Sequence, residues 1–277
     1  MSQLAQQIHE AIGTALADDA LELPVLPEVA LNIREEAARA SVCVKSLAEV
    51  IGADAGLVAR LIKVVNSPMF RGSRSIDELP AAISRLGLDY SANLATGVAM
   101  KQMFQATSEH VDRVLRSTWS HSSAVAALSA TLATERTNLR SDQAMLAGLT
   151  HSIGALPILS WAEENDHLLG DSITLERVIG SIHGSIGTMI LQRWEFPEEV
   201  AMVPSQYQNL RRQPEAADYT SVVTVADLLA KGIENYNASE LSLDDVEAFA
   251  MLRLDPQNED LLQQMVEIAN AGKAALA

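Results

Sequence analysis

The chain has 277 residues and a formal net charge of −16, and hydrophobic residues make up 48% of it. This length and composition suffice for a large buried core, in one large helical domain or two small ones. The negative charge disfavours nucleic acid and anionic membranes as partners, because both are themselves negatively charged. The one cysteine, Cys43, excludes an internal disulfide and a zinc site built on paired cysteines.

Composition and pattern predict an all-α fold. Segments rich in Ala, Leu, Glu and Gln dominate, and strict alternation of β-branched residues is absent. The first residues, Met1–Gly13, show no basic stretch followed by an apolar core. We therefore expect no secretory signal and a cytoplasmic protein.

The first hundred residues are divided into short helices by their glycines, prolines and caps. Pro24 and Pro27 keep the segment before the second helix extended, and Pro27 suits its start. Asp54 is a candidate N-cap, and Gly87 a candidate helix end. Helices are predicted over residues 3–17, from Pro27 onward, and over 44–52, 54–65, 78–86 and 89–105.

An apolar run from Ser141 to Glu163 is expected to form a helix enclosed on most sides by protein, because it has no polar face. Ser141 is the predicted N-cap, and Pro157 predicts a break or kink near Ala155–Leu156. His151 lies in the middle of this run. The run is too polar at its centre for a membrane span.

Three other predicted helices place a titratable residue among apolar ones. In a helix over 108–136, His121 shares a face with apolar residues. In a helix capped by Thr174, His183 aligns with Ile179 and Ile186. Asp227 lies within an apolar helix that follows. Ser242 is expected to cap a short acidic helix, and residues 257–277 to form the last one.

His121, His151, His183 and Asp227 each have two interpretations. A single buried histidine is more often a hydrogen-bonded core residue than a ligand. Four such residues together favour one buried polar site, and histidine nitrogens with a carboxylate suit Zn²⁺, Mn²⁺ or Fe²⁺. Their wide separation in the sequence leaves both interpretations open.

Three separated segments resemble the HDOD domain, a bacterial signalling module related to the HD superfamily of metal-dependent phosphohydrolases. They are LPVLPEVALNI from Leu23, DAGLVARLIKVVNSPMF from Asp54 and SIDELPAAISRLG from Ser75. The resemblance spans about residues 20–235. It implies an N-terminal helix (1–19), a helical N-terminal part (20–106), an HD-like helical bundle (107–236) and a C-terminal helical extension (237–277).

The same resemblance gives each candidate residue a place. His121 resembles the first metal-binding histidine of HD enzymes, His151 the histidine of their His-Asp doublet, and Asp227 their distal aspartate. Ser152 replaces the aspartate of the doublet. His183 resembles an additional histidine of two-metal relatives, whose His-His pair reads Tyr207-Gln208 here.

These replacements indicate a degenerate site, because a neutral hydroxyl cannot bridge two metal ions as a carboxylate does. The first hypothesis is therefore a non-catalytic signal-transduction module that binds a protein partner, without a cofactor. Its interaction surface is expected near Phe70–Ser75 and the flanking helices. The alternative is a residual metal-dependent phosphohydrolase with one weak divalent metal on His121, His151 and Asp227. A third possibility is a sensor of a nucleotide or small molecule.

Overall fold

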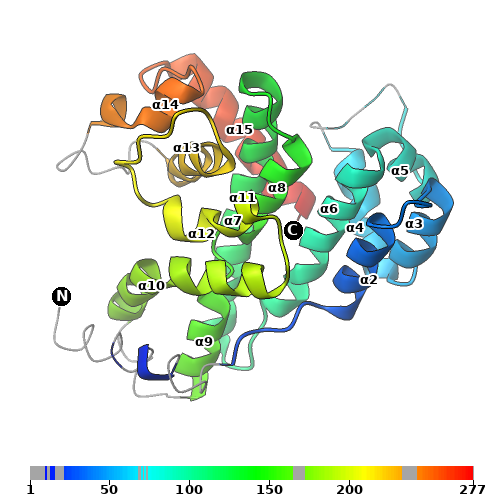
Figure 1. Cartoon of the computed structure of the whole chain (residues 1–277), viewed down its shortest axis with the longest axis horizontal. Helices are drawn as coiled ribbons and strands as arrows, with labels where there is room; N and C mark the ends of the chain where they lie inside the picture. The colour runs from blue at the N-terminus through cyan, green and yellow to red at the C-terminus, as the bar shows by residue number, and fades with distance from the viewer. Residues whose placement is uncertain are drawn as a thin grey trace.

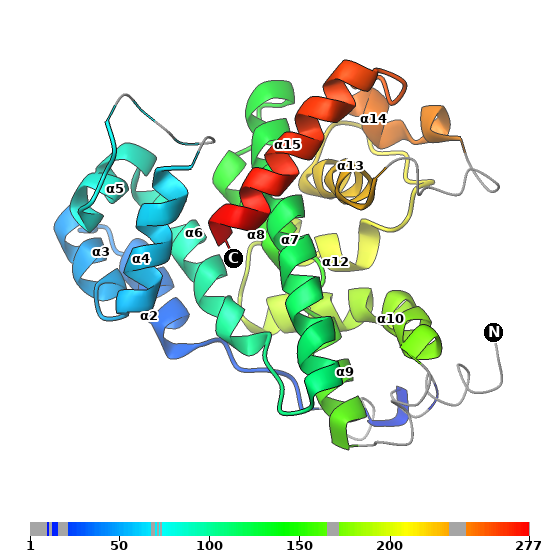
Figure 2. The same ribbon diagram turned by 180° about the vertical axis from the view of Figure 1, so that it is seen from behind.

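The computed structural model describes residues 10, 13–15, 22–67, 70, 72, 74–164, 172–232 and 242–276, with the backbone alone for 172–178. Within these residues every regular element is a helix, which confirms the all-α fold (Figures 1 and 2). Most of the helix predicted over residues 3–17 lies outside them.

The N-terminal bundle contains five helices, and the sequence anticipated most of their boundaries. The Asp54 side chain accepts a hydrogen bond of 3.0 Å from the backbone N–H of Leu57, as expected of an N-cap. Gly87 has a φ of 86°, the left-handed conformation that favours glycine, and it separates the last two helices. The five are α2 (Glu28–Ala37), α3 (Val44–Ile51), α4 (Ala55–Val65), α5 (Leu79–Leu86) and α6 (Leu88–Ala99).

The rest of the chain is built around one long helix, α7 (Glu109–Arg136). It packs against α8 (Ser141–Thr150), α13 (Tyr219–Lys231) and α15 (Glu259–Leu276). In Figure 1, α9 and α10 lie below this group. The remaining elements are η1 (Met100–Met103), α9 (Ala155–Glu164), α10 (Ser172–Arg193), α11 (Glu198–Ala201), α12 (Val203–Gln206), η4 (Leu243–Asp245) and α14 (Glu247–Met251).

The apolar run that begins at Ser141 forms two helices, and the break between them lies directly before the predicted position. Residues 151–154 form a turn between α8 and α9, and α9 begins at Ala155. Pro157 lies in the first turn of α9, where its missing N–H removes no intrahelical hydrogen bond. The proline therefore begins a helix here and does not bend one.

The same segment passes a length and composition test for a membrane span, as residues Ser141–Glu164 with a mean hydropathy of 1.3. Of the best window, however, 89% is buried inside the fold. Its apolar character is explained by its position in the core of this protein.

Two predicted helix starts need correction, and a third is right in position only. Arg140, not Ser141, is the N-cap of α8, and no side chain caps it. Thr174 is not a cap, because α10 begins two residues earlier, at Ser172. Ser242 is the N-cap of η4, a short 3-10 helix, as predicted, but its side chain makes no capping hydrogen bond. Each residue has the right chemistry for a cap, so the boundaries follow tertiary packing more than local preference.

The N-terminal bundle contacts the C-terminal end of α10 through hydrogen bonds and one cation–π contact. The Arg34 guanidinium donates to the carbonyls of Trp194 and Glu195, at 2.7 Å for the second. It also lies 4.2 Å from the centre of the Phe196 ring. The Trp194 indole in turn donates to the carbonyl of Pro24, at 3.1 Å. A cation at the C-terminal end of a helix is favourable, so this contact stabilises the arrangement of the two parts. Their division at residues 106 and 236 stays a prediction.

Candidate metal centre

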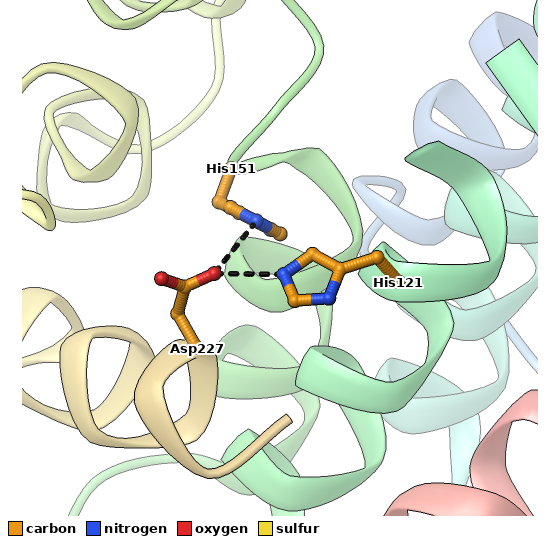
Figure 3. A group of neighbouring side chains, drawn as sticks. All are labelled: His121, His151 and Asp227. Carbon is orange, nitrogen blue, oxygen red and sulfur yellow. Dashed lines mark hydrogen bonds and ion pairs between the residues drawn. The ribbon is translucent and has the colours of Figure 1, made fainter. Parts of the chain in front are cut away.

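Three of the four predicted residues converge on one point. One possible ligand atom each from His121, His151 and Asp227 lies within 4.8 Å of the others. Figure 3 shows both imidazoles directed at the same carboxylate oxygen. These residues come from α7, from the turn after α8 and from α13, so the packing of three helices assembles the site.

Two glycines allow this close packing. A Cβ atom on Gly148 would lie 2.6 Å from the Cα of Ala126, so α8 contacts the backbone of α7 directly. A Cβ on Gly154 would lie 1.9 Å from the carbonyl oxygen of His183, so the turn that carries His151 rests on the backbone of α10. Close packing therefore requires a glycine at position 154, three residues after His151.

His151 is held as a neutral imidazole. Its Nδ1 lies 2.7 Å from the carbonyl oxygen of Gly148, which can only accept, so Nδ1 carries the proton. Burial lowers the pKa of His151 to about 3. Its Nε2 then presents a lone pair toward Oδ1 of Asp227, at 3.8 Å. This contact is no ion pair at neutral pH, and the lone pair is oriented as a metal ligand would be.

The Asp227 carboxylate is already neutralised by the protein. His121 Nε2 lies 2.7 Å from Oδ1, and the Lys231 ammonium lies 2.6 Å from Oδ2. Burial alone would raise the pKa of Asp227, but the hydrogen bond from His121 and the charge of Lys231 outweigh it and lower the pKa. The buried carboxylate is thus ionised and paired.

Ser152 has a protein partner in place of a metal. Its hydroxyl lies 2.7 Å from that of Ser122, the residue after His121. Both serines are buried. This hydrogen bond satisfies two polar groups at the position where the resemblance leads one to expect a carboxylate.

His183 does not join the other three. Its Nδ1 donates to the carbonyl of Ile179, at 2.8 Å, and its Nε2 therefore accepts from the hydroxyl of Tyr207, at 3.0 Å. The Gln208 amide donates to the same hydroxyl, at 3.2 Å. Burial lowers the pKa of His183 and raises that of Tyr207. With both ring nitrogens bonded, His183 is a hydrogen-bonded core residue and not a further ligand.

The ligand atoms of the three converging residues are of the types that bind one divalent ion, but their negative charge is too small to balance it. Two imidazole nitrogens and one carboxylate oxygen form a common ligand set for Zn²⁺, Mn²⁺ or Fe²⁺. The one negative charge, on Asp227, is opposed by Lys231 at 2.6 Å. His121, whose side chain is 27% exposed, leaves the site open to solvent on one side. The set could therefore hold one weakly bound ion.

Sequence reasoning missed two polar partners at this site, Lys231 and Ser122. Lys231 lies one helical turn after Asp227, a spacing that commonly forms an ion pair. That signal was present in the sequence. Ser122 follows His121 directly and has no such signal, because its contact with Ser152 depends on how α7 and α8 pack.

Fold and site together define an all-α protein with an HD-like helical arrangement. The family model of the HDOD domain matches residues 23–210. The chain therefore belongs to the HDOD domain family, and the resemblance seen in the three sequence segments is confirmed.

Proteins similar to the chain include two solved structures and one curated protein. A protein of Shewanella amazonensis SB2B, provisionally described as a metal-dependent phosphohydrolase, is 31% identical, with a TM-score of 0.87 over 100% of both chains. An HDOD domain protein of unknown function from Geobacter sulfurreducens shares the fold, with 21% identity and a TM-score of 0.67 over 92% of this chain and 93% of that one. An uncharacterised protein of Treponema pallidum (strain Nichols) is 26% identical in an alignment of 223 residues, which covers 74% of this chain and only 41% of that protein's length.

Proposed function

We propose that this chain is a non-catalytic regulatory module of a bacterial signalling pathway, which acts in the cytoplasm by binding a protein partner. One observation carries the proposal: the chain itself supplies partners for Asp227 and for Ser152, the two positions from which an HD-type site would take its negative charge. Lys231 pairs with Asp227 at 2.6 Å, and Ser122 bonds to Ser152 at 2.7 Å. Membership of the HDOD domain family supports the signalling role.

Electrostatics explain why this arrangement disfavours hydrolysis. A two-metal mechanism requires two ions about 3.5–4 Å apart around one nucleophilic oxygen, and a bridging carboxylate helps to hold them there. Ser152 supplies no charge, and the ammonium of Lys231 repels a second cation. What remains of the site is a buried polar cluster. It holds three elements in place relative to one another: α7, α13 and the turn between α8 and α9.

A residual metal-dependent phosphohydrolase is the second candidate. It is favoured by the convergence of His121, His151 and Asp227 and by the provisional description of the Shewanella amazonensis protein. In this case His121 Nε2, His151 Nε2 and Asp227 would hold the ion, which would supply a bound, activated water. The substrate class would be a phosphate ester or nucleotide.

Metal content and turnover distinguish the two candidates. Purified protein would be analysed for bound metals and assayed with p-nitrophenyl phosphate and bis(p-nitrophenyl) phosphate in the presence of Mn²⁺. We expect less than one ion per chain and no turnover above that of a His151→Ala variant. Turnover that His151→Ala abolishes would overturn the proposal.

The partner-binding half needs its own experiment. A pull-down from native lysate is expected to recover a specific protein, and its failure would count against this half. The predicted surface near Phe70–Ser75 is only partly described, and Phe70 packs edge-on against Tyr90 with ring centres 5.1 Å apart. A Phe70→Ser variant is expected to weaken the recovery, with the exposed Val25→Ser as the matched control.

A further inference from the structure

A cavity separate from the metal centre lies where the N-terminal bundle meets the last helix. Its volume is about 500 Å³. Val64 of α4 and Leu94 of α6 form one wall, and residues of α7, α8 and α15 form the other. Figure 2 shows the end of α15 directed toward the N-terminal bundle, and α15 also contacts α4. Cavities of this size between two parts of a chain are common ligand sites.

The inner part of the cavity is apolar. Ala127 of α7, Met145 of α8 and Ala275 of α15 line it, and all three are buried. A volume of about 500 Å³ lies in the range of small-molecule sites, so a small ligand is the occupant that this cavity fits.

One end of the cavity is acidic, as the register of α7 against α15 shows. The Trp119 indole donates to the carbonyl of Leu276, at 3.2 Å, and a Cβ on Gly272 would lie 2.3 Å from Cβ of Ala127. The two helices therefore run antiparallel. It follows that Glu267 lies toward the Glu135 end of α7, away from Ala127.

Among the described residues that line the cavity, these two carboxylates are the charged ones. Glu135 is next to the last residue of α7, and the carbonyls at the end of this helix add negative potential. Ala127 and Glu135 are eight residues apart on α7, which corresponds to about 12 Å along the helix axis.

We propose that this cavity binds a small molecule with an apolar body, about 12 Å or less in length, and a protonated amine at one end. The apolar body lies among Ala127, Met145 and Ala275, and the amine lies near Glu135 and Glu267. Because the walls come from both parts of the chain, the bound ligand holds the N-terminal bundle against α7 and α15. The site gives the regulatory module an input, and it is independent of the metal centre.

The test uses three probes with the same alkyl chain and different charges. Octylamine, octanol and octanoate would be titrated into the full-length protein, with binding followed by calorimetry and by chemical shifts. We expect octylamine to bind about three- to tenfold more tightly than octanol, as two partly exposed charge pairs allow, and octanoate to bind least. Absence of binding by octylamine, or equal binding of all three probes, would overturn the proposal.

Variants locate the site. Ala271 lines the cavity, whereas Ala274, one turn away on α15, is exposed and does not. Ala271→Trp is expected to abolish octylamine binding and Ala274→Trp to leave it unchanged. Glu135→Gln with Glu267→Gln removes the charge without altering the packing, and it should reduce the preference for octylamine over octanol to about twofold or less. An unchanged preference in this double variant would contradict the assignment of the acidic end, whether or not Ala271→Trp folds.

Discussion

The ammonium of Lys231 lies 2.6 Å from Oδ2 of Asp227, while His121 holds Oδ1 of the same carboxylate at 2.7 Å. Lys231 thus supplies the positive charge that a metal ion would otherwise bring to this buried aspartate. A metal and Lys231 compete for one negative charge. The balance between them determines whether the centre is a structural cluster or an ion site.

Lys231→Met should therefore change metal affinity and stability in opposite directions. Without metal, Asp227 loses the partner of its Oδ2 atom and keeps only His121, so the free energy of unfolding should fall by about 1–3 kcal/mol. Affinity for Mn²⁺ or Zn²⁺ should rise about fivefold, since the side chain of Lys231 is 51% exposed and its repulsion is screened. Calorimetric titration and urea unfolding measure the two effects. Lys45→Met is the control, because the side chain of Lys45 is 87% exposed and far from the site in the chain.

Ser152→Asp should increase metal uptake if the HD-type geometry survives. The new carboxylate would lie beside the Ser122 hydroxyl, which can donate to it, and would add the missing negative charge. We expect the metal content after dialysis against Mn²⁺ to rise toward one ion per chain. Ser185→Asp, on the exposed face of α10, controls for the added charge. No rise relative to this control would mean that His121, His151 and Asp227 are core hydrogen-bonding residues only.

Stability should fall as the pH is lowered, because His151 is buried in its neutral form. The unfolded chain binds a proton near pH 6.5, whereas burial lowers the pKa of folded His151 to about 3. Between these values the unfolded state holds more protons, so the free energy of unfolding decreases with falling pH. The full slope for one group is about 1.4 kcal/mol per pH unit. His183, whose pKa is also lowered by burial, adds to the effect.

A variant of His151 measures how much this residue contributes to the pH dependence of stability. His151→Asn keeps a donor for the Gly148 carbonyl but removes the titrating group. Urea unfolding of both proteins at pH 7.5 and pH 5.0 should show a smaller loss of stability in the variant. The matched control is His110→Asn, a histidine near the start of α7 and outside the cluster. Equal losses in wild type and His151→Asn would show that His151 is not buried as a neutral group.

The sequence predicted the fold well where local chemistry controls it. Asp54 and Gly87 act as an N-cap and a helix end because these functions depend on their own backbone and side chain. Ser141 has suitable cap chemistry, but α8 begins after Arg140, whose side chain instead pairs with Asp142 at 2.7 Å. The capping preference of Ser141 alone cannot predict the contact between Arg140 and Asp142.

At the site, the predictions depended on the resemblance more than on spacing. His121, His151 and Asp227 converge, although 106 residues separate the first from the last. The same spacing argument included His183, whose Nε2 instead accepts a hydrogen bond from Tyr207. From the sequence, Tyr207 is identifiable only as a replacement for a histidine of two-metal relatives. Its hydrogen bond depends on how α10 and α12 pack, which the hydrophobic pattern does not specify.

Two glycines provide a last test of how the turn is built. Gly154→Ala would place a methyl group 1.9 Å from the carbonyl oxygen of His183 and 2.6 Å from the Gly187 nitrogen. Since both neighbours are backbone, the turn or α10 must move, and the free energy of unfolding should fall by about 3 kcal/mol or more. Gly180→Ala on α10 meets nothing within 4 Å and should instead gain about 0.5–1 kcal/mol from helix preference. Thermal and urea unfolding of both variants measure these opposite signs. If Gly154→Ala left the free energy of unfolding unchanged, the turn that carries His151 would not be in close contact with α10. The geometry of the centre would then have to be revised.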